Sequence, residues 1–168
     1  MPTDAELAFA DKLGGYVARQ YGLPPVFGRV SAWLLICDPP EQTAAEIAEA
    51  LHASRSAVGS AIASLENQGQ VRRTRAAGER ADRVSFHPEA AVQGLEAPEE
   101  YRAMMALARE GLEVLRDASP GRRARLLHAV AFYEFLLERM PAVADEWRAY
   151  RDALIASGEL PDPGQGEP

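Results

Sequence analysis

The sequence has very few of the residues on which most enzymes and metal proteins depend. Its 168 residues include one cysteine, three histidines and one lysine. A single cysteine forms no internal disulfide and no thiolate metal cluster, which fits a reducing compartment. The three histidines are dispersed, and the chain has no HExxH, CxxC, phosphate-loop or nucleophile-elbow pattern. We therefore expect no enzymatic activity, no metal and no cofactor.

Long apolar runs are also missing. No run approaches the roughly 18 residues that a membrane-spanning helix requires. The first residues, MPTDAELAFADKLGG, carry acids early and do not resemble a signal peptide. A composition of 47% hydrophobic and 26% charged residues is typical of a globular protein. We expect a cytoplasmic protein with no membrane partner, built from one domain or slightly more.

The net charge of −7 is unevenly distributed. Residues 52–87 contain six arginines against three acids, whereas residues 88–168 contain nine arginines against fifteen acids. Arginine has a planar guanidinium group that suits phosphates and base edges. The acidic total therefore does not exclude a nucleic-acid partner, because a basic segment of about three dozen residues lies inside it.

Apolar residues at helical spacing predict an N-terminal region, residues 1–40, of two helices. Thr3 and Glu6 form a capping-box pattern for a helix over residues 3–21. An apolar helix over residues 26–37 follows and ends before Pro39. We expect this region to support the core and a dimer interface.

Residues 41–88 read as a short helix, a turn, a second helix, and two strands joined by an arginine-bearing loop. Thr43 opens the first helix, and Ser54 caps the second. The period then changes to two, which predicts antiparallel strands over residues 71–75 and 83–87. This order is typical of a winged helix-turn-helix, and the basic segment coincides with its second helix and wing.

The candidate DNA contacts lie on that helix and wing. A helix fits the major groove, where short hydroxyl side chains and one long arginine reach phosphates and base edges. Arg80, at the loop tip, is placed to enter a minor groove, and we expect Asp82 to orient Arg80 or Arg83. The candidates are Ser54, Arg55, Ser56, Ser60, Arg72, Arg73, Arg75, Arg80 and Arg83. The alternative is a structural helix-turn-helix whose arginines form a solvated face.

Residues 98–157 predict a helical dimerisation region, followed by a disordered tail over residues 158–168. Pro98 and Pro120 each stand where a helix begins, and Pro141 is expected to divide the last helical stretch in two. The apolar stripe expected to form the dimer interface consists of Leu126, Val130, Tyr133, Leu137, Trp147 and Leu154. The fold class is thus mainly α, with a two-stranded β-wing and flanking N- and C-terminal dimerisation helices.

The segment GLPPVFGRVSAWLLICDPPEQTAAEIAEALHASRSAVGSAIASLENQGQVRR, with AAGERADRVSFHP, resembles the MarR-like regulators of the GbsR type. The matching positions are Gly22, Leu23, Pro24, Gly28, Arg29, Leu34, Leu35, Ser54, Val58, Gly78, Glu79 and Arg80. The sequence departs from the family at Gly59, where members often have serine; here serine comes one place later, at Ser60.

The resemblance implies a homodimeric, ligand-responsive transcriptional regulator whose terminal helices form the dimer interface. It also implies a quaternary-amine effector, which an aromatic cage would hold by cation–π attraction. Candidates for the cage are Phe27, Trp33, Phe132, Tyr133 and Trp147. Aromatic residues at helical spacing more often belong to the core or to a dimer interface than to a cage. Cys37 lies beside Asp38 and is more often an inert buried thiol than a redox switch.

These patterns predict a sequence-specific regulator, a repressor rather than an activator, that binds duplex DNA as a homodimer on an inverted-repeat operator and responds to a small-molecule effector. The other class that fits is a helical adaptor that dimerises through its C-terminal helices and does not bind DNA. The salt dependence of DNA affinity separates the two classes: a DNA-binding regulator should lose affinity steeply as the salt concentration rises, whereas an adaptor should show a flat response.

Overall fold

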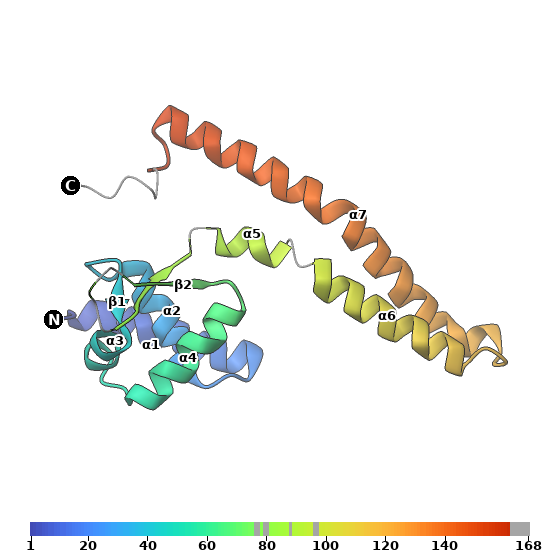
Figure 1. Cartoon of the computed structure of the whole chain (residues 1–168), viewed down its shortest axis with the longest axis horizontal. Coiled ribbons are helices and arrows are strands. Elements are labelled where there is room, and N and C mark those ends of the chain that lie inside the picture. The colour runs from blue at the N-terminus through green and yellow to red at the C-terminus, as the bar shows by residue number, and fades with distance from the viewer. Residues whose placement is uncertain (76–77, 79–80, 88, 96–97, 162–168) are drawn as a thin grey trace. The chain divides into compact units, whose positions relative to one another are not determined.

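A computed structural model describes residues 1–75, 78, 81–87, 89–95 and 98–161. The chain divides into two units, residues 1–91 and 92–168, and each is described by itself. The elements, in chain order, are α1 (Asp4–Tyr21), α2 (Pro25–Ile36), β1 (Gln42–Thr43), α3 (Ala44–Ala50), α4 (Arg55–Asn67), β2 (Val71–Thr74), β3 (Arg83–Phe86), α5 (Ala90–Leu95), α6 (Pro98–Val114) and α7 (Pro120–Ser157) (Figure 1).

Helix α1 begins and ends where the sequence predicts. The backbone N–H of Thr3 donates to Glu6 Oε2 over 2.6 Å, and the N–H of Glu6 donates to Thr3 Oγ1 over 3.3 Å, which completes a capping box. At the other end Gly22 has φ 66°, a left-handed conformation that glycine adopts without steric cost.

Helices α1 and α2 cross closely at two glycines. A Cβ atom on Gly28 would lie 2.6 Å from the carbonyl oxygen of Leu13, and one on Gly14 would lie 2.7 Å from Cγ of Arg29. Gly14 weakens the middle of α1 as an isolated helix, but it allows the two backbones to touch. Arg29 then joins three elements: its Nε lies 2.8 Å from Asp11 Oδ1, and its Nη2 donates to the carbonyl of Leu51 over 2.9 Å.

The core of the first unit forms where α2, α3, α4 and the sheet meet. Its fully buried side chains include Val30, Ile47, Leu51, Val58, Ile62 and Val84. Burying aliphatic side chains of this size stabilises a fold by about 1.5–3 kcal/mol each, so this cluster holds the helix-turn-helix together.

The two predicted wing strands are present and pair antiparallel, with Arg73 opposite Val84. The sequence did not predict β1, a two-residue strand that pairs with β3 through Gln42 and Val84. The sheet therefore has three strands in the order β1-β3-β2. A two-residue strand has no detectable alternation, which is why the period gave no sign of it.

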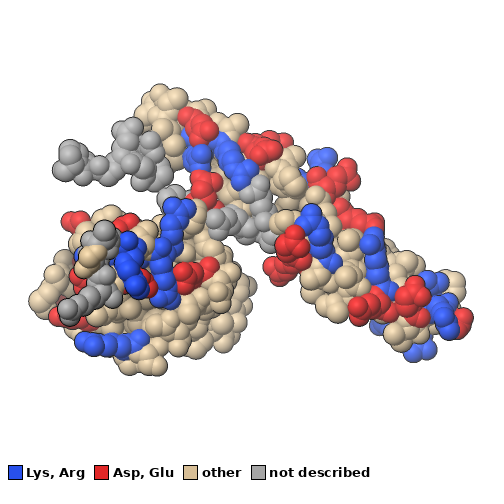
Figure 2. Space-filling model, in the orientation of Figure 1, with Lys and Arg blue, Asp and Glu red and all other residues tan. Residues whose placement is uncertain are grey.

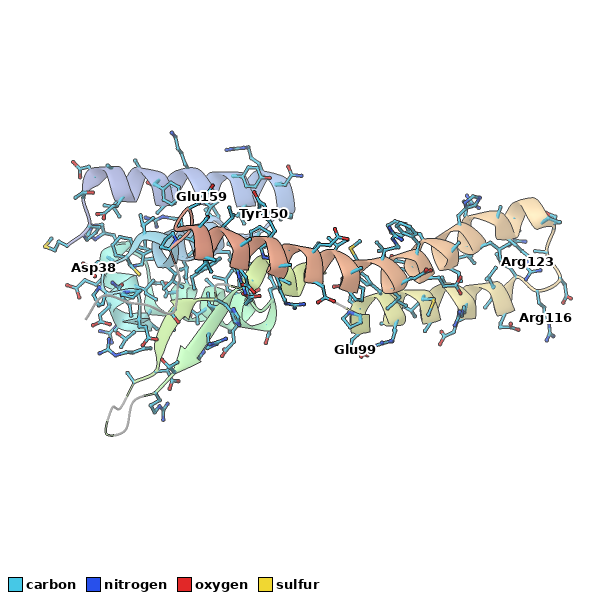
Figure 3. All side chains as sticks on the ribbon, turned by 90° about the horizontal axis from the view of Figure 1, so that it is seen from above. Asp38, Glu99, Arg116, Arg123, Tyr150 and Glu159 are labelled. Atoms are coloured by element: carbon cyan, nitrogen blue, oxygen red, sulfur yellow. The ribbon has the colours of Figure 1, made fainter. Side chains whose placement is uncertain are left out.

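The second unit contains α6 and α7, which lie side by side as a helical hairpin (Figures 1 and 3). Arg116 and Arg123 mark its turn in Figure 3. Near the turn, a Cβ on Gly111 would lie 2.8 Å from Cδ1 of Leu126, so the helices approach closely there. No described helix is long and apolar enough to cross a membrane.

The expectation that Pro141 divides the last helical stretch is wrong. Helix α7 continues through Pro141 for 38 residues, to Ser157, and Gly158 ends it with φ 76°. A proline inside a helix removes one backbone hydrogen bond at a cost of about 3 kcal/mol. Pro141 is exposed and lines a cavity together with Tyr101, Leu137 and Met140. Residues 162–168 of the predicted tail lie outside the described residues.

Candidate nucleic-acid interface

Helices α3 and α4 form the helix-turn-helix. Thr43 caps α3 through a second capping box, in which its backbone N–H donates to Glu46 Oε2 over 2.6 Å. His52, in the turn, has φ 48°, one of the few non-glycine residues able to bend the chain in the left-handed region. Ser54 then caps α4, its Oγ accepting the N–H of Ala57 over 3.2 Å. Side-chain caps therefore fix the N-terminal ends of both α3 and α4, and the turn at His52 joins the two helices.

Helix α4 has a buried face and an exposed face, as a recognition helix requires. Val58 and Ile62 are fully buried, whereas Arg55, Ser56 and Ser60 are exposed. Arg55 has no hydrogen-bond or ion-pair partner among the described residues. A Cβ on Gly59 would meet nothing within 4 Å, so the backbone is open to close approach there. The first turn of α4 thus presents one free guanidinium and short hydroxyl side chains.

Two of the wing arginines, by contrast, already form ion pairs. Arg73 Nε lies 2.7 Å from Glu66 Oε2, and Arg75 Nε lies 2.6 Å from Asp82 Oδ1. Asp82 therefore pairs with Arg75, a partner that the sequence did not predict; Arg80, one of the two expected partners, lies outside the described residues. The hydrogen bond from Arg75 lowers the pKa of the Asp82 carboxyl, so the pair stays charged near neutral pH. Figure 2 shows cationic and acidic side chains next to each other over this sheet.

Arg72 lies near the base of the wing, opposite Ser85, whereas Arg83 lies at the loop end of the strands, opposite Thr74. Arg72 Nη2 is 2.7 Å from His87 Nε2, and burial, with the charge of Arg72, lowers the pKa of His87. Arg83 Nη1 donates to the carbonyl of Glu41 over 3.3 Å. Because side chains alternate along β2, Arg72 and Arg73 point to opposite faces of the sheet. Arg80 and Glu79, at the wing tip, lie outside the described residues.

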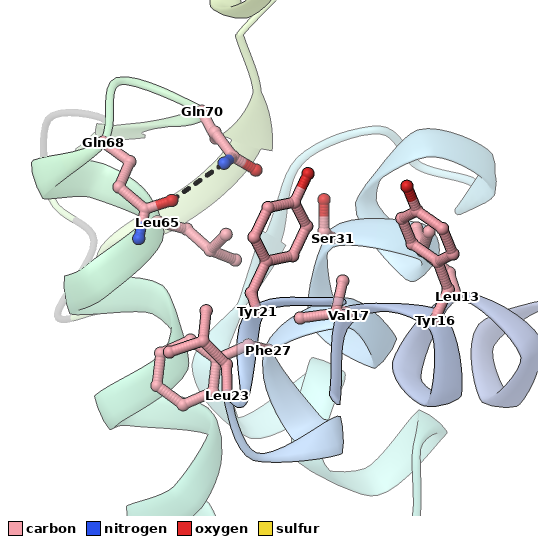
Figure 4. Close-up of a pocket in the computed structure, with 11 residues that line it drawn as sticks. Leu13, Tyr16, Val17, Tyr21, Leu23, Phe27, Ser31, Leu65, Gln68 and Gln70 are labelled. Atoms are coloured by element: carbon pink, nitrogen blue, oxygen red, sulfur yellow. Dashed lines mark hydrogen bonds between the residues drawn. The ribbon is translucent and has the colours of Figure 1, made fainter. Parts of the chain in front are cut away.

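Phe27 and Trp33, two of the aromatic candidates for an effector cage, belong to different cavities. Phe27 lines a cavity of about 550 Å³ together with Tyr16 and Tyr21 of α1 and Gln68, just beyond α4 (Figure 4). Sequence reasoning did not single out these tyrosines as cavity residues, because the cavity brings together segments that lie far apart in the chain. Trp33 is instead 5% exposed in the core and lines a second cavity. The remaining candidates, Phe132, Tyr133 and Trp147, lie on α7 in the second unit.

Two of the predicted dimer residues, Leu126 and Leu137, face α6 of their own hairpin. Leu126 packs on Gly111, and Leu137 lies beside Tyr101 of α6. Leu126, Val130, Tyr133, Leu137 and Leu154 are half-buried, whereas Trp147 is exposed. The apolar side chains that α7 leaves exposed include Phe132, Phe135, Val143 and Tyr150.

Cys37 is buried at the end of α2, and its Sγ lies 3.9 Å from the carbonyl oxygen of Pro40. Burial, together with the nearby charge of Asp38, raises the pKa of the thiol to about 11. Almost no reactive thiolate is present at neutral pH.

Comparison with known proteins identifies the family to which this chain belongs. The model of the MmpR5-like MarR family transcriptional regulators matches residues 89–150. The HTH-type transcriptional regulator MmpR5 of Mycobacterium tuberculosis (strain ATCC 25618 / H37Rv) is 36% identical over 123 residues, which cover 71% of this chain and 73% of MmpR5. A crystal structure of a transcriptional regulator has a TM-score of 0.80 at 28% identity, over 86% of this chain and 99% of that chain. The chain therefore belongs to the MarR family of winged-helix transcriptional regulators.

Proposed function

We propose that this protein represses transcription by binding duplex DNA as a homodimer on an inverted-repeat operator. The observation that carries the proposal is the outer face of α4, where Arg55 is exposed and without a partner among the described residues. In a winged helix-turn-helix this position faces the major groove, where arginine pairs with guanine O6 and N7. Two such helices in a two-fold dimer would lie roughly 34 Å apart, about one turn of DNA.

The test is the affinity for duplex DNA as a function of salt, for the wild type, Arg55→Ala and the matched control Arg125→Ala. Arg125 is also exposed and without a partner among the described residues, but it lies on α7. The wild type and the control are expected to show a steep log–log slope. Arg55→Ala is expected to bind the preferred sequence at least about 30-fold more weakly, because the dimer loses one base contact of about 1–3 kcal/mol in each half-site. A flat slope for the wild type would identify the protein as an adaptor that does not bind DNA.

A homodimer is supported by the exposed aromatic residues of α7. Phe132 and Phe135 are each 55% exposed, and Tyr150 is 59% exposed. Such side chains are costly in water and are typical of an interface. Phe135→Glu is expected to give monomers in sedimentation with the hairpin intact. Leu137→Glu is a poorer test because Leu137 also packs inside the hairpin. An unchanged mass for Phe135→Glu would reject the interface.

Ligand response and the GbsR-type assignment with its quaternary-amine effector rest on the sequence resemblance and remain predictions. The cavity at Phe27 supports a ligand response, because Leu65 and Gln68 line it and belong to α4 and its end. A ligand there would bias the position of α4 by its differential affinity for two states. Choline is expected to weaken DNA binding by the wild type and not by Phe27→Ala. Equal DNA affinity with and without choline would exclude this effector.

The family is one of transcriptional regulators, and we expect no enzymatic activity and a cytoplasmic location.

A further inference from the structure

The second cavity of the first unit has a strongly acidic lining. It measures about 530 Å³ and lies where the N-terminal end of α1, the end of α2, β1 and α3 meet. The acidic residues Glu6, Asp38, Glu46 and Glu49 line it, together with His52. Figure 3 labels Asp38 at this end of the unit. Cavities of this size hold small organic molecules.

The carboxylates fall into two pairs with different roles. Glu6 and Glu46 each accept hydrogen bonds from their capping threonines, which lowers the pKa of both carboxyl groups and keeps them charged. The side chains of Asp38 and Glu49 make no hydrogen bond or ion pair among the described residues. The carboxylates of Glu6 and Glu46 are thus held in their charged form, and those of Asp38 and Glu49 are available to bind a ligand.

A buried amide gives the cavity a second, independent feature. Gln42 is only 7% exposed, yet it lines the cavity. Trp33 donates its indole N–H to Oε1 of Gln42 over 2.8 Å. Because an indole nitrogen only donates, the amide oxygen must face Trp33, and this fixes the orientation of the amide. Its Nε2 has no hydrogen-bond partner in the described part of the chain and is not sealed within protein.

An amide Nε2 carries two donors, and where it opens into the cavity a ligand oxygen can take the place of water as its acceptor. Carboxylates nearby require a cation, and they hold one best through charge-assisted hydrogen bonds from N–H groups. A simple metal ion would satisfy the carboxylates but not the amide. A quaternary amine has no N–H to donate, and Trp33 is the only aromatic side chain among the lining residues.

We propose that this cavity binds a small organic cation that carries a protonated amine and, a few bonds away, an oxygen acceptor. The amine would donate to Asp38 and Glu49, and the oxygen would accept from Nε2 of Gln42. The site is separate from the cavity at Phe27, shares no lining residue with it, and does not depend on DNA binding.

Three matched probes test the proposal on the full chain without DNA. They are 2-phenoxyethylamine, 3-phenylpropylamine, in which a methylene replaces the ether oxygen, and the neutral N-(2-phenoxyethyl)acetamide. Binding is followed by the NMR signal of the Trp33 indole N–H, identified by its loss in Trp33→Phe. We expect the ether amine to bind several-fold more tightly than the methylene amine, and at least tenfold more tightly than the acetamide. Equal shifts with all three, or no shift with any, would overturn the proposal.

Variants separate the two halves of the site. Asp38→Asn and Glu49→Gln are exposed changes that preserve shape, and each is expected to weaken both amines several-fold. Glu113→Gln on α6 is the matched control and should change nothing. Gln42→Glu keeps an oxygen for Trp33 but removes the donor, so the preference for the ether amine should vanish while binding of both amines persists. If the preference survives in Gln42→Glu, or if Glu113→Gln weakens binding equally, the site is wrong.

Discussion

Arg73 of β2 and Glu66 of α4 form an ion pair with 2.7 Å between Nε and Oε2. The pair ties the wing to the recognition helix and neutralises one arginine of the basic segment. With the pair between Arg75 and Asp82, it balances part of the positive charge that the sequence places on the wing.

Glu66→Gln should release Arg73 for phosphate contact. We expect tighter binding to duplex DNA and a log–log salt slope steeper by about two, because one more cation from each protomer of the dimer meets the backbone. Filter binding over a salt series measures both quantities. Glu113→Gln removes the same charge from α6 and serves as the control. A slope unchanged from the wild type would show that Arg73 does not reach DNA.

Arg80→Ala should weaken binding most at operators with A·T-rich flanks, since a narrow minor groove concentrates the negative potential that attracts arginine. Footprinting of the wild type should show protection where the wing enters the groove. Normal binding by Arg80→Ala, with no such protection in the wild type, would mean that the wing tip does not contact DNA.

Gly28→Ala should destabilise the protein. The new Cβ would lie 2.6 Å from the carbonyl oxygen of Leu13, which is backbone and can move only if α1 shifts. We expect a loss of about 1–3 kcal/mol in the free energy of unfolding. Gly121→Ala is the control, since a Cβ there meets nothing within 4 Å. Equal stability of the two variants in urea titration would contradict the close crossing of α1 and α2.

Cys37 should react slowly with thiol reagents at neutral pH in the folded protein and quickly after unfolding, because its pKa is raised to about 11 by burial. The protonated thiol is favoured by folding, so this contribution to stability is complete below pH 9 and is lost as the pH rises from about 9 to 11. Cys37→Ala should lack that part of the pH dependence. Fast labelling of the native protein at pH 7 would refute the buried thiol.

Periodicity and capping residues were enough to predict the helices of the first unit and both wing strands, because those signals are local. The partner of Asp82, the strand at Gln42 and the cavities depend on residues brought together from distant segments, which no local pattern records. The local cost of Pro141 alone does not predict the outcome, because helix α7 continues for many residues on both sides of it.

Selection of bound sequences from a random duplex pool, with the wild type and Arg55→Ala in parallel, tests the central claim most directly. We predict that the wild type enriches an inverted repeat with half-sites one helical turn apart, and that Arg55→Ala loses the preference at one base pair in each half-site. A pool that remains random with the wild type, or an identical motif from both proteins, would contradict the assignment of α4 as the reading helix.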